Sequence, residues 1–379
     1  MKKLFLSVAA LLCATLMFSQ SNASDVKQTG TSNSTDVLQV GALNASLVDQ
    51  NGVSNIATVA QKGYVQTSDV YQEGDMNDAD VKQGAGFGYD NFAEVDQYGY
   101  ANVSRQLQLV QGNTGTVYQK GTSNLAVQEQ YGTPFIGGNN ASISQTGFDS
   151  DGNGSYNKAY QTQYGFGNDA KVVQWTYEQY ASQLQTGVNN DATIYQDSDG
   201  DGNHATQEQW GVDNKAESYQ NWGADYTDNL NSGANLSVQL QVGEGNEAYV
   251  AQDRGTDYTA VAGGDTYSVK SIVSSGSKNN EARQTQQGNF ANGNRAYSHQ
   301  AGSYNLSLQN QKDTENFSYM QQDGMSNYAS DLQDGYMNRS GVYQVGDNNR
   351  SMVDQLGSTH ASKVAQDGIT NWSNVVQRD

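Results

Sequence analysis

Polar and small apolar side chains alternate along most of the chain in units that end on a glutamine. In the unit at 55–61, Asn55, Ala57, Val59 and Gln61 stand at every second position. Alternate residues of a β-strand point to the same face. These four side chains are therefore expected to line one face of a strand, with the intervening residues on the other face.

This unit recurs every eleven residues. Glutamines stand at Gln28, Gln39, Gln50, Gln61, Gln72 and Gln83, and the same spacing returns from Gln300 to Gln377. Between these stretches the spacing shifts by a few residues and recovers, which gives about 28 units. Representative residues of the repeated face are Asn55, Ala57, Gln61, Asn77, Ala79, Gln83, Asn327, Ala329, Gln333, Asn349, Ser351, Gln355, Asn371, Ser373 and Gln377.

The repeat predicts a β-solenoid. A glycine usually stands two residues after the glutamine, as at Gly52 and Gly63, and is expected in a tight turn because glycine tolerates positive φ. Each unit then forms one strand and one turn, and two units form a coil of 22 residues. We expect an all-β fold of roughly fourteen or fifteen coils, with two facing parallel sheets and with Asn and Gln side chains stacked in ladders along the axis.

The full motif resembles the curlin repeat of curli fibre subunits. It has Gln, Gly, Asn, Ala and Gln at fixed spacing, as in Gln50, Gly52, Asn55, Ala57 and Gln61. The resemblance implies a secreted protein that leaves the cell through an outer-membrane pore. It also implies polymerisation outside the cell, templated by a nucleator subunit, into pilus-like functional amyloid fibres that serve biofilm matrix and surface adhesion. The chain holds about three times as many repeats as the major fibre subunit of that family, so a long fibre subunit, a nucleator-like or accessory subunit and a fibre-tethered adhesin all stay open.

The N-terminus has the pattern of a secretory signal peptide. Lys2 and Lys3 precede an apolar run from Leu4 to Phe18, which is too short to span a membrane. Ser21-Asn22-Ala23 is the best cleavage site, but cleavage after Ala23 would cut an in-phase unit, and processing near Gln20 is the alternative. The expected organisation is a signal peptide at 1–23, a repeat solenoid at 24–252, an irregular insertion at 253–279 and a second solenoid block at 280–379.

Composition restricts the function classes. The net charge of −20 disfavours nucleic acid as a partner, because nucleic acids are bound mainly through Lys and Arg. The three histidines, His204, His299 and His360, are scattered, and no acid/base cluster is apparent, so we do not expect an enzyme. We expect no membrane span and no cofactor other than the calcium considered next.

One loop resembles a calcium-binding loop. Asp197, Asp199, Asp201 and Glu208 match the ligand spacing of an EF-hand loop. The strand phase resumes at Asn203, where an EF-hand would begin a helix. A calcium site and a solvated acidic turn both remain open.

Two further alternatives concern the surface and the ends. Tyr71, Tyr118, Tyr195, Tyr219 and Tyr343 precede the glutamine and should face outward, where they either bind other surfaces or pack along the sheet. The repeat leaves no room for a distinct capping helix at either end, which favours self-assembly into fibres over the alternative of a monomeric solenoid adhesin that binds glycans or surfaces. Because the acidic surface repels itself, assembly is expected to quicken as the pH falls towards the pI of 4.3.

Overall fold

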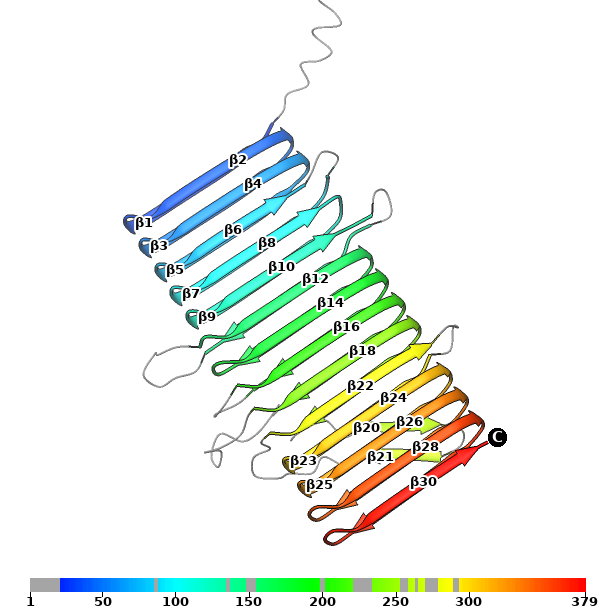
Figure 1. The fold of residues 1–379 in the computed structure, drawn as a ribbon. Helices are drawn as coiled ribbons and strands as arrows, with labels where there is room; N and C mark the ends of the chain where they lie inside the picture. Colours follow the sequence, from blue (N-terminus) through cyan, green and yellow to red (C-terminus); the bar gives the residue numbers. More distant parts are fainter. Residues whose placement is uncertain are drawn as a thin grey trace, which may run out of the picture.

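The computed structural model shows an elongated stack of strands (Figure 1). It describes residues 21–84, 88–133, 137–147, 155–197, 202–220, 234–252, 258–262, 265–269, 279–288 and 293–379. All the regular elements in these ranges are β-strands. Nowhere in them is there a helix that is long and apolar enough to cross a membrane. The predicted signal peptide lies outside the described residues, apart from its last three positions.

Twenty-eight of the 30 strands form two parallel sheets of 14 strands each, which we call sheet A and sheet B. Sheet A contains β1 (Ala23–Thr31), β3 (Ala45–Val53), β5 (Thr67–Asp75), β7 (Phe92–Tyr100), β9 (Thr114–Thr122), β11 (Asn140–Thr146), β13 (Asp169–Trp175), β15 (Asp191–Gln196), β17 (Lys215–Gln220), β19 (Glu247–Gln252), β23 (Arg295–Ser303), β25 (Phe317–Met325), β27 (Arg339–Val345) and β29 (Ala361–Asp367). Sheet B contains β2 (Ser34–Ala42), β4 (Ile56–Tyr64), β6 (Asp78–Gln83), β8 (Val103–Leu109), β10 (Leu125–Tyr131), β12 (Lys158–Phe166), β14 (Tyr180–Val188), β16 (His204–Val212), β18 (Leu236–Glu244), β22 (Glu281–Gly288), β24 (Leu306–Thr314), β26 (Tyr328–Tyr336), β28 (Arg350–Ser358) and β30 (Trp372–Arg378).

Consecutive strands alternate between the two sheets, so two strands make one coil. Each strand pairs in parallel with the equivalent strand of the next coil; β3 pairs with β5, for example, and places Gln50 beside Gln72. This register repeats the same residue type up the stack, and it confirms the predicted β-solenoid with two strands per coil.

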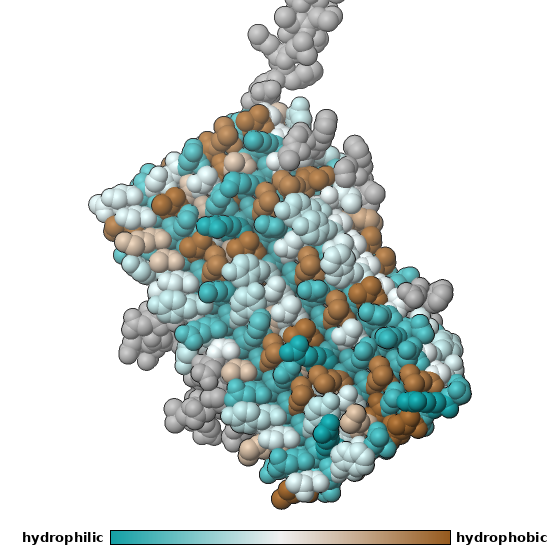
Figure 2. Space-filling model, in the orientation of Figure 1, coloured by the Kyte–Doolittle hydropathy of each residue, from teal (hydrophilic) through white to brown (hydrophobic). Residues whose placement is uncertain are grey.

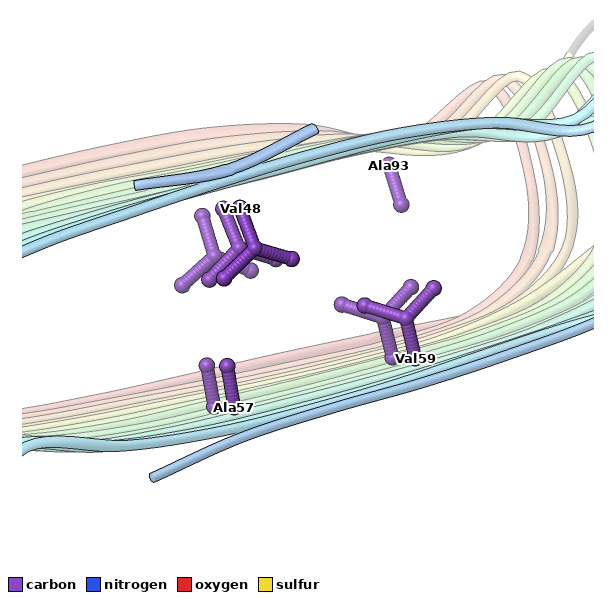
Figure 3. Packing of buried hydrophobic residues seen from close by; sticks show 8 residues of the cluster. Val48, Ala57, Val59 and Ala93 are labelled. Carbon is purple, nitrogen blue, oxygen red and sulfur yellow. The ribbon is translucent and has the colours of Figure 1, made fainter. Parts of the chain in front are cut away.

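The space between the sheets is narrow and filled by small side chains. Val48 and Ala93 from sheet A face Ala57 and Val59 from sheet B (Figure 3). All four are at most 1% exposed. Alanine and valine suffice here because the adjoining polar positions are also buried and hydrogen-bonded to one another. This explains how a chain with only 35% hydrophobic residues forms a closed interior.

The sheets continue past the predicted insertion at 253–279. β18 pairs with β22 and β19 pairs with β23, so neither sheet is interrupted there. Within the insertion, β20 (Tyr258–Ala262) and β21 (Asp265–Val269) form an antiparallel pair of their own. The rest of the segment, up to 278, lies outside the described residues.

Candidate functional site: the amide ladders

The glutamine at the end of each unit forms a continuous ladder in each sheet. Nε2 of Gln50 donates to Oε1 of Gln72 at 2.8 Å and to the carbonyl oxygen of Ser34, in the opposite sheet, at 3.1 Å. Oε1 of Gln50 accepts from Gln28 at 2.7 Å. Both amide hydrogens are therefore used, one along the axis and one across the coil. The ladder thus ties successive coils together and also ties sheet A to sheet B.

The asparagine of each unit forms a second kind of ladder, but it does not lie in the strand as predicted. Asn55 is the residue before β4, and Ser54 ahead of it has a φ of 58°. Oδ1 of Asn55 accepts from the backbone N–H of Asn77 at 3.0 Å, and its Nδ2 donates to the carbonyl oxygen of Gly74 at 2.7 Å. The asparagine therefore replaces the missing backbone bonds of the turn, which helps to hold a non-glycine residue in the left-handed region.

The repeated glycine also has a different place from the one predicted. Gly52 lies inside β3 rather than in the turn, with a φ of 129°, and it stands directly against Gly74 of the next coil. A Cβ at Gly52 would overlap the carbonyl oxygen of Gly74. The glycine column is required by close packing between coils as well as by its backbone conformation.

The structure places the sequence-predicted ladder residues along these columns. Ala57, Ala79, Ala329 and Ser351 are buried. Ser373 in the last coil is half-buried, and its Oγ donates to Oγ of Ser351 at 3.1 Å. The asparagine and glutamine positions are joined by the bonds Asn55–Asn77, Gln61–Gln83, Asn327–Asn349, Gln333–Gln355, Asn349–Asn371 and Gln355–Gln377.

A further glutamine ladder, which was not predicted from the sequence, runs along the inner face of sheet B. It occupies the column two residues before the repeated glutamine, and its rungs are Gln106, Gln128, Gln161, Gln183, Gln207, Gln239, Gln284 and Gln309, joined by bonds of 2.7–3.0 Å. The signal in the sequence is the pattern Gln-x-Gln in place of Val-x-Gln in every second unit from Gln106 to Gln311. The middle of the solenoid is therefore more polar inside than its two ends.

The ladders have a direction. Each repeated glutamine donates to the coil that follows it in the chain. Among the described residues none donates to Oε1 of Gln28 in β1 or of Gln39 in β2. At the other end, Nε2 of Gln366 donates to the carbonyl oxygen of Arg350, and Nε2 of Gln377 donates to that of Ala361. The second hydrogen of each of these two amides has no acceptor among the described residues. The two ends of the stack therefore present complementary acceptors and donors.

The predicted calcium loop is only partly described. Asp197 follows β15 and is 6% exposed, and its backbone N–H donates to the carbonyl oxygen of Gln220 at 3.0 Å. Glu208 lies within β16, where a parallel register with β14 and β18 replaces the helix of an EF-hand. Asp199 and Asp201 lie outside the described residues. Over the ranges that are described, no group of three or more His, Cys, Asp or Glu side chains could hold a metal ion, and calcium at this loop stays a prediction.

The predicted outward tyrosines pack against one another on sheet A. Tyr195 and Tyr219 have ring centroids 5.0 Å apart and nearly parallel rings. Tyr249 and Tyr319 also lie on the outer face of this sheet, yet they are 5% and 1% exposed. These contacts support packing along the sheet; binding of other surfaces through tyrosine stays a prediction.

The three histidines lie in separate coils. His204 makes an edge-to-face contact with Tyr180, and His299 is buried. His360 occupies an asparagine position, where its backbone N–H donates to Oδ1 of Asn338 at 3.0 Å.

Comparison with known families agrees with the geometry. The profile of the curlin associated repeat matches residues 30–63, 54–84, 324–357 and 338–368. No curated protein matches the chain. In the matched stretches the ladder partners are 22 residues apart in the sequence, whereas in the middle of the chain they are as many as 48 residues apart. The chain therefore contains curlin repeats in both of the matched stretches, which supports its assignment to the curlin-repeat family.

Proposed function

We propose that the protein is a structural subunit of a curli-like extracellular fibre and assembles by stacking one copy on the next. The observation that carries this proposal is the one-directional amide ladder, whose acceptors are open at Gln28 and Gln39 and whose donors are open at Gln366 and Gln377. A second copy placed with β1 on β29 and β2 on β30 continues both sheets. It also sets Gln28 beside Gln366 and Gln39 beside Gln377 in the register found between all other coils.

The end strands support the same proposal. Within the described residues, β1 pairs with β3 alone and β30 pairs with β28 alone. Unpaired strand edges are templates for further strands, and natural proteins that stay monomeric usually block them. Stacking also buries amides that would otherwise be exposed, and an amide buried with its partners costs far less than one without.

The outer faces of the two sheets differ from the end coils in that, over the described residues, they carry no comparable set of complementary donors and acceptors. Hydrophobic and hydrophilic residues are intermixed over the face in Figure 2, where no single apolar patch dominates. Many of the charged residues lie on the outer sides of the strands, such as Asp49 beside Lys27 on sheet A. The end coils, rather than the sheet faces, are thus the parts of the surface with the most specific complementarity.

Secretion through an outer-membrane pore, templating by a nucleator subunit and a role in biofilm and adhesion belong to the same proposal, on the basis of the family.

The first test is assembly of the mature chain. Protein diluted from denaturant should form fibres that bind thioflavin T, show a meridional spacing near 4.7–4.8 Å and are seeded by preformed fragments. A stable β-rich monomer that neither forms nor extends fibres would overturn the proposal and favour a monomeric solenoid.

A sharper test uses Asn374 in β30. Arg350 of β28 donates to the carbonyl of Asn371, so by alternation along a parallel strand the N–H of Asn374 points to the open end. Asn374→Pro removes no bond within the chain but blocks an incoming strand. We expect it to fold normally by circular dichroism and to form no fibres alone. The matched control Asn374→Ala should assemble as the parent does, and equal assembly of both variants would exclude stacking through β30.

A further inference from the structure

The inner glutamine ladder of sheet B ends on a carboxylic acid. In the register of the sheet, the residue after Gln309 in this column is Asp331, and the residue after Asp331 is Val353. Asp331 thus stands between eight stacked glutamines and a short column of valines, in the core of β26. It is 2% exposed.

Among the described residues, no cationic side chain acts on Asp331. The side chains that face it are Gln309 from β24, Ser318 from β25, Ser340 from β27 and Val353 from β28, none of which titrates. Of the charged groups in the described ranges, Asp354 on the outer side of β28 acts on Asp331 and opposes its ionisation. Burial is the largest effect and raises the pKa of Asp331 to about 7, although the Ser318 and Ser340 hydroxyls act in the opposite direction.

The hydrogen bonds around Asp331 suit a neutral acid better than a carboxylate. Nε2 of Gln309 donates to the carbonyl of Tyr297 and to Oγ of Ser318, each at 2.9 Å, and so it has no hydrogen left for Asp331. Neither carboxyl oxygen of Asp331, nor Oγ of Ser340, has a hydrogen bond of good geometry. Small rotations would let a protonated Asp331 donate to Ser340 and accept from Ser318. An ionised Asp331 would be a buried negative charge with only two hydroxyl groups to donate to it and, in the described part of the chain, no cation beside it. Burying a charge in this way costs free energy.

We propose that Asp331 is a proton-controlled latch on the C-terminal coils: protonated, it holds β26 to β30 in the stack, and ionised, it loosens them. This inference rests on the proposed function for its consequence, because β29 and β30 form the surface on which a second copy is proposed to dock. Assembly at that end is then favoured by mild acid through one buried group, in addition to any effect of surface charge.

The direction of the pH dependence follows from the difference in proton binding between the folded and the opened coils. A carboxyl group whose pKa is higher in the folded state than in the unfolded state keeps its proton in the fold while the opened form releases it. Stability of the C-terminal coils is therefore full below the ordinary aspartate range, near pH 4, and falls as the pH rises towards 7. Above that pH both forms are ionised and the loss is complete. Over this window the opening constant rises by about tenfold per pH unit.

The direct test is hydrogen exchange of the soluble, unassembled chain between pH 4.5 and 8, with rates corrected for intrinsic exchange. Amides of β26 and β28 should open more readily as the pH rises, with a slope approaching tenfold per unit that levels off near pH 7, while amides of β3 and β5 stay unchanged. Asp331→Asn and Asp331→Gln should both abolish the slope, because neither amide ionises between pH 4.5 and 8. Asp334→Asn, a change on the outer face of the same strand, should keep the slope.

The outcomes separate this inference from the fibre proposal. A flat pH profile in the parent chain, or an unchanged slope in both Asp331 variants, would overturn the latch whether or not fibres form. Seeded elongation then tests its consequence: the Asp331→Gln chain should elongate at pH 7.5 nearly as fast as at pH 5.5, whereas the parent should slow. If neither chain forms fibres while the exchange slope is present, the fibre proposal fails and the latch stands.

Discussion

Nε2 of Gln50 lies 2.8 Å from Oε1 of Gln72, and both side chains are fully buried in adjacent coils. Identical residues can satisfy one another in this way because an amide is both donor and acceptor. The bond repeats along the solenoid, and the predictions below follow from the dependence of each rung on its neighbours.

Replacing one internal rung should be costly. Gln72→Leu would leave an N–H of Gln50, Oε1 of Gln97 and the carbonyl of Ile56 each short of a partner. Since a buried group left without its partner costs about 1–3 kcal/mol, we expect a loss of about 3 kcal/mol or more. Urea denaturation of the soluble chain measures it. The matched control is Gln287→Leu on the exposed face of β22, and equal midpoints for the two variants would contradict the role of the ladder.

The column of repeated glycines should not tolerate substitution, for two reasons that can be tested separately. At Gly52 an alanine meets both an unfavourable φ of 129° and the carbonyl oxygen of Gly74. At Gly137 the φ is 118° but no atom lies within 4 Å of the added Cβ. We expect Gly137→Ala to cost about 1–2 kcal/mol from backbone strain, and Gly52→Ala to cost clearly more. Thermal unfolding compares them, and similar shifts in Tm would mean that close packing between coils contributes little.

His299 should make the fold sensitive to acid. Burial lowers its pKa from 6.5 to about 4, and among the described residues neither ring nitrogen has a hydrogen-bond partner. The unfolded chain therefore binds a proton between pH 6.5 and 4 that the folded chain does not, so stability falls as the pH falls through that window, by up to about 3 kcal/mol. His299→Gln, which matches Gln321 in the next coil, should remove this loss. Denaturation midpoints of the parent and of His299→Gln at pH 4.5 and 7 test it, and an equal change of midpoint with pH in the two chains would contradict it.

Surface charge should set the overall rate of assembly. With a net charge of −20, copies repel one another, and salt screens this repulsion over about 10 Å at 0.1 M. The thioflavin T lag time should shorten on going from 10 mM to 150 mM NaCl, and again as the pH falls towards 4.3. A lag time indifferent to both would show that repulsion does not limit assembly. Because Asp331 is internal, the salt effect should persist in Asp331→Gln.

Much of the fold was predictable because the same residue types recur at the strand positions in nearly every unit. The alternation from Asn55 to Gln61 indicated the strands, and the eleven-residue spacing from Gln50 to Gln61 to Gln72 indicated the two-strand coil. The place of Asn55 and of Gly52 was not predictable, since alternation alone does not show where a strand begins and ends. Asn55 lies before the strand because its side chain bonds to turn backbone of the next coil, and Gly52 lies within it because the next coil approaches too closely for a side chain.

The sequence by itself determined the repeat, the β-solenoid, the family resemblance and the residues of the repeated Asn and Gln ladders, because a side-chain period of two and a unit of eleven leave few ways to bury so many amides. Only the tertiary structure decided what depends on the neighbouring coil. It placed Gln309, Asp331 and Val353 in one column, gave the amide bonds their single direction, and buried His299 and Tyr319 on what alternation marks as an outer face. Those properties arise from contacts between residues 22 or more positions apart, and a local pattern carries no information on which partner each side chain meets.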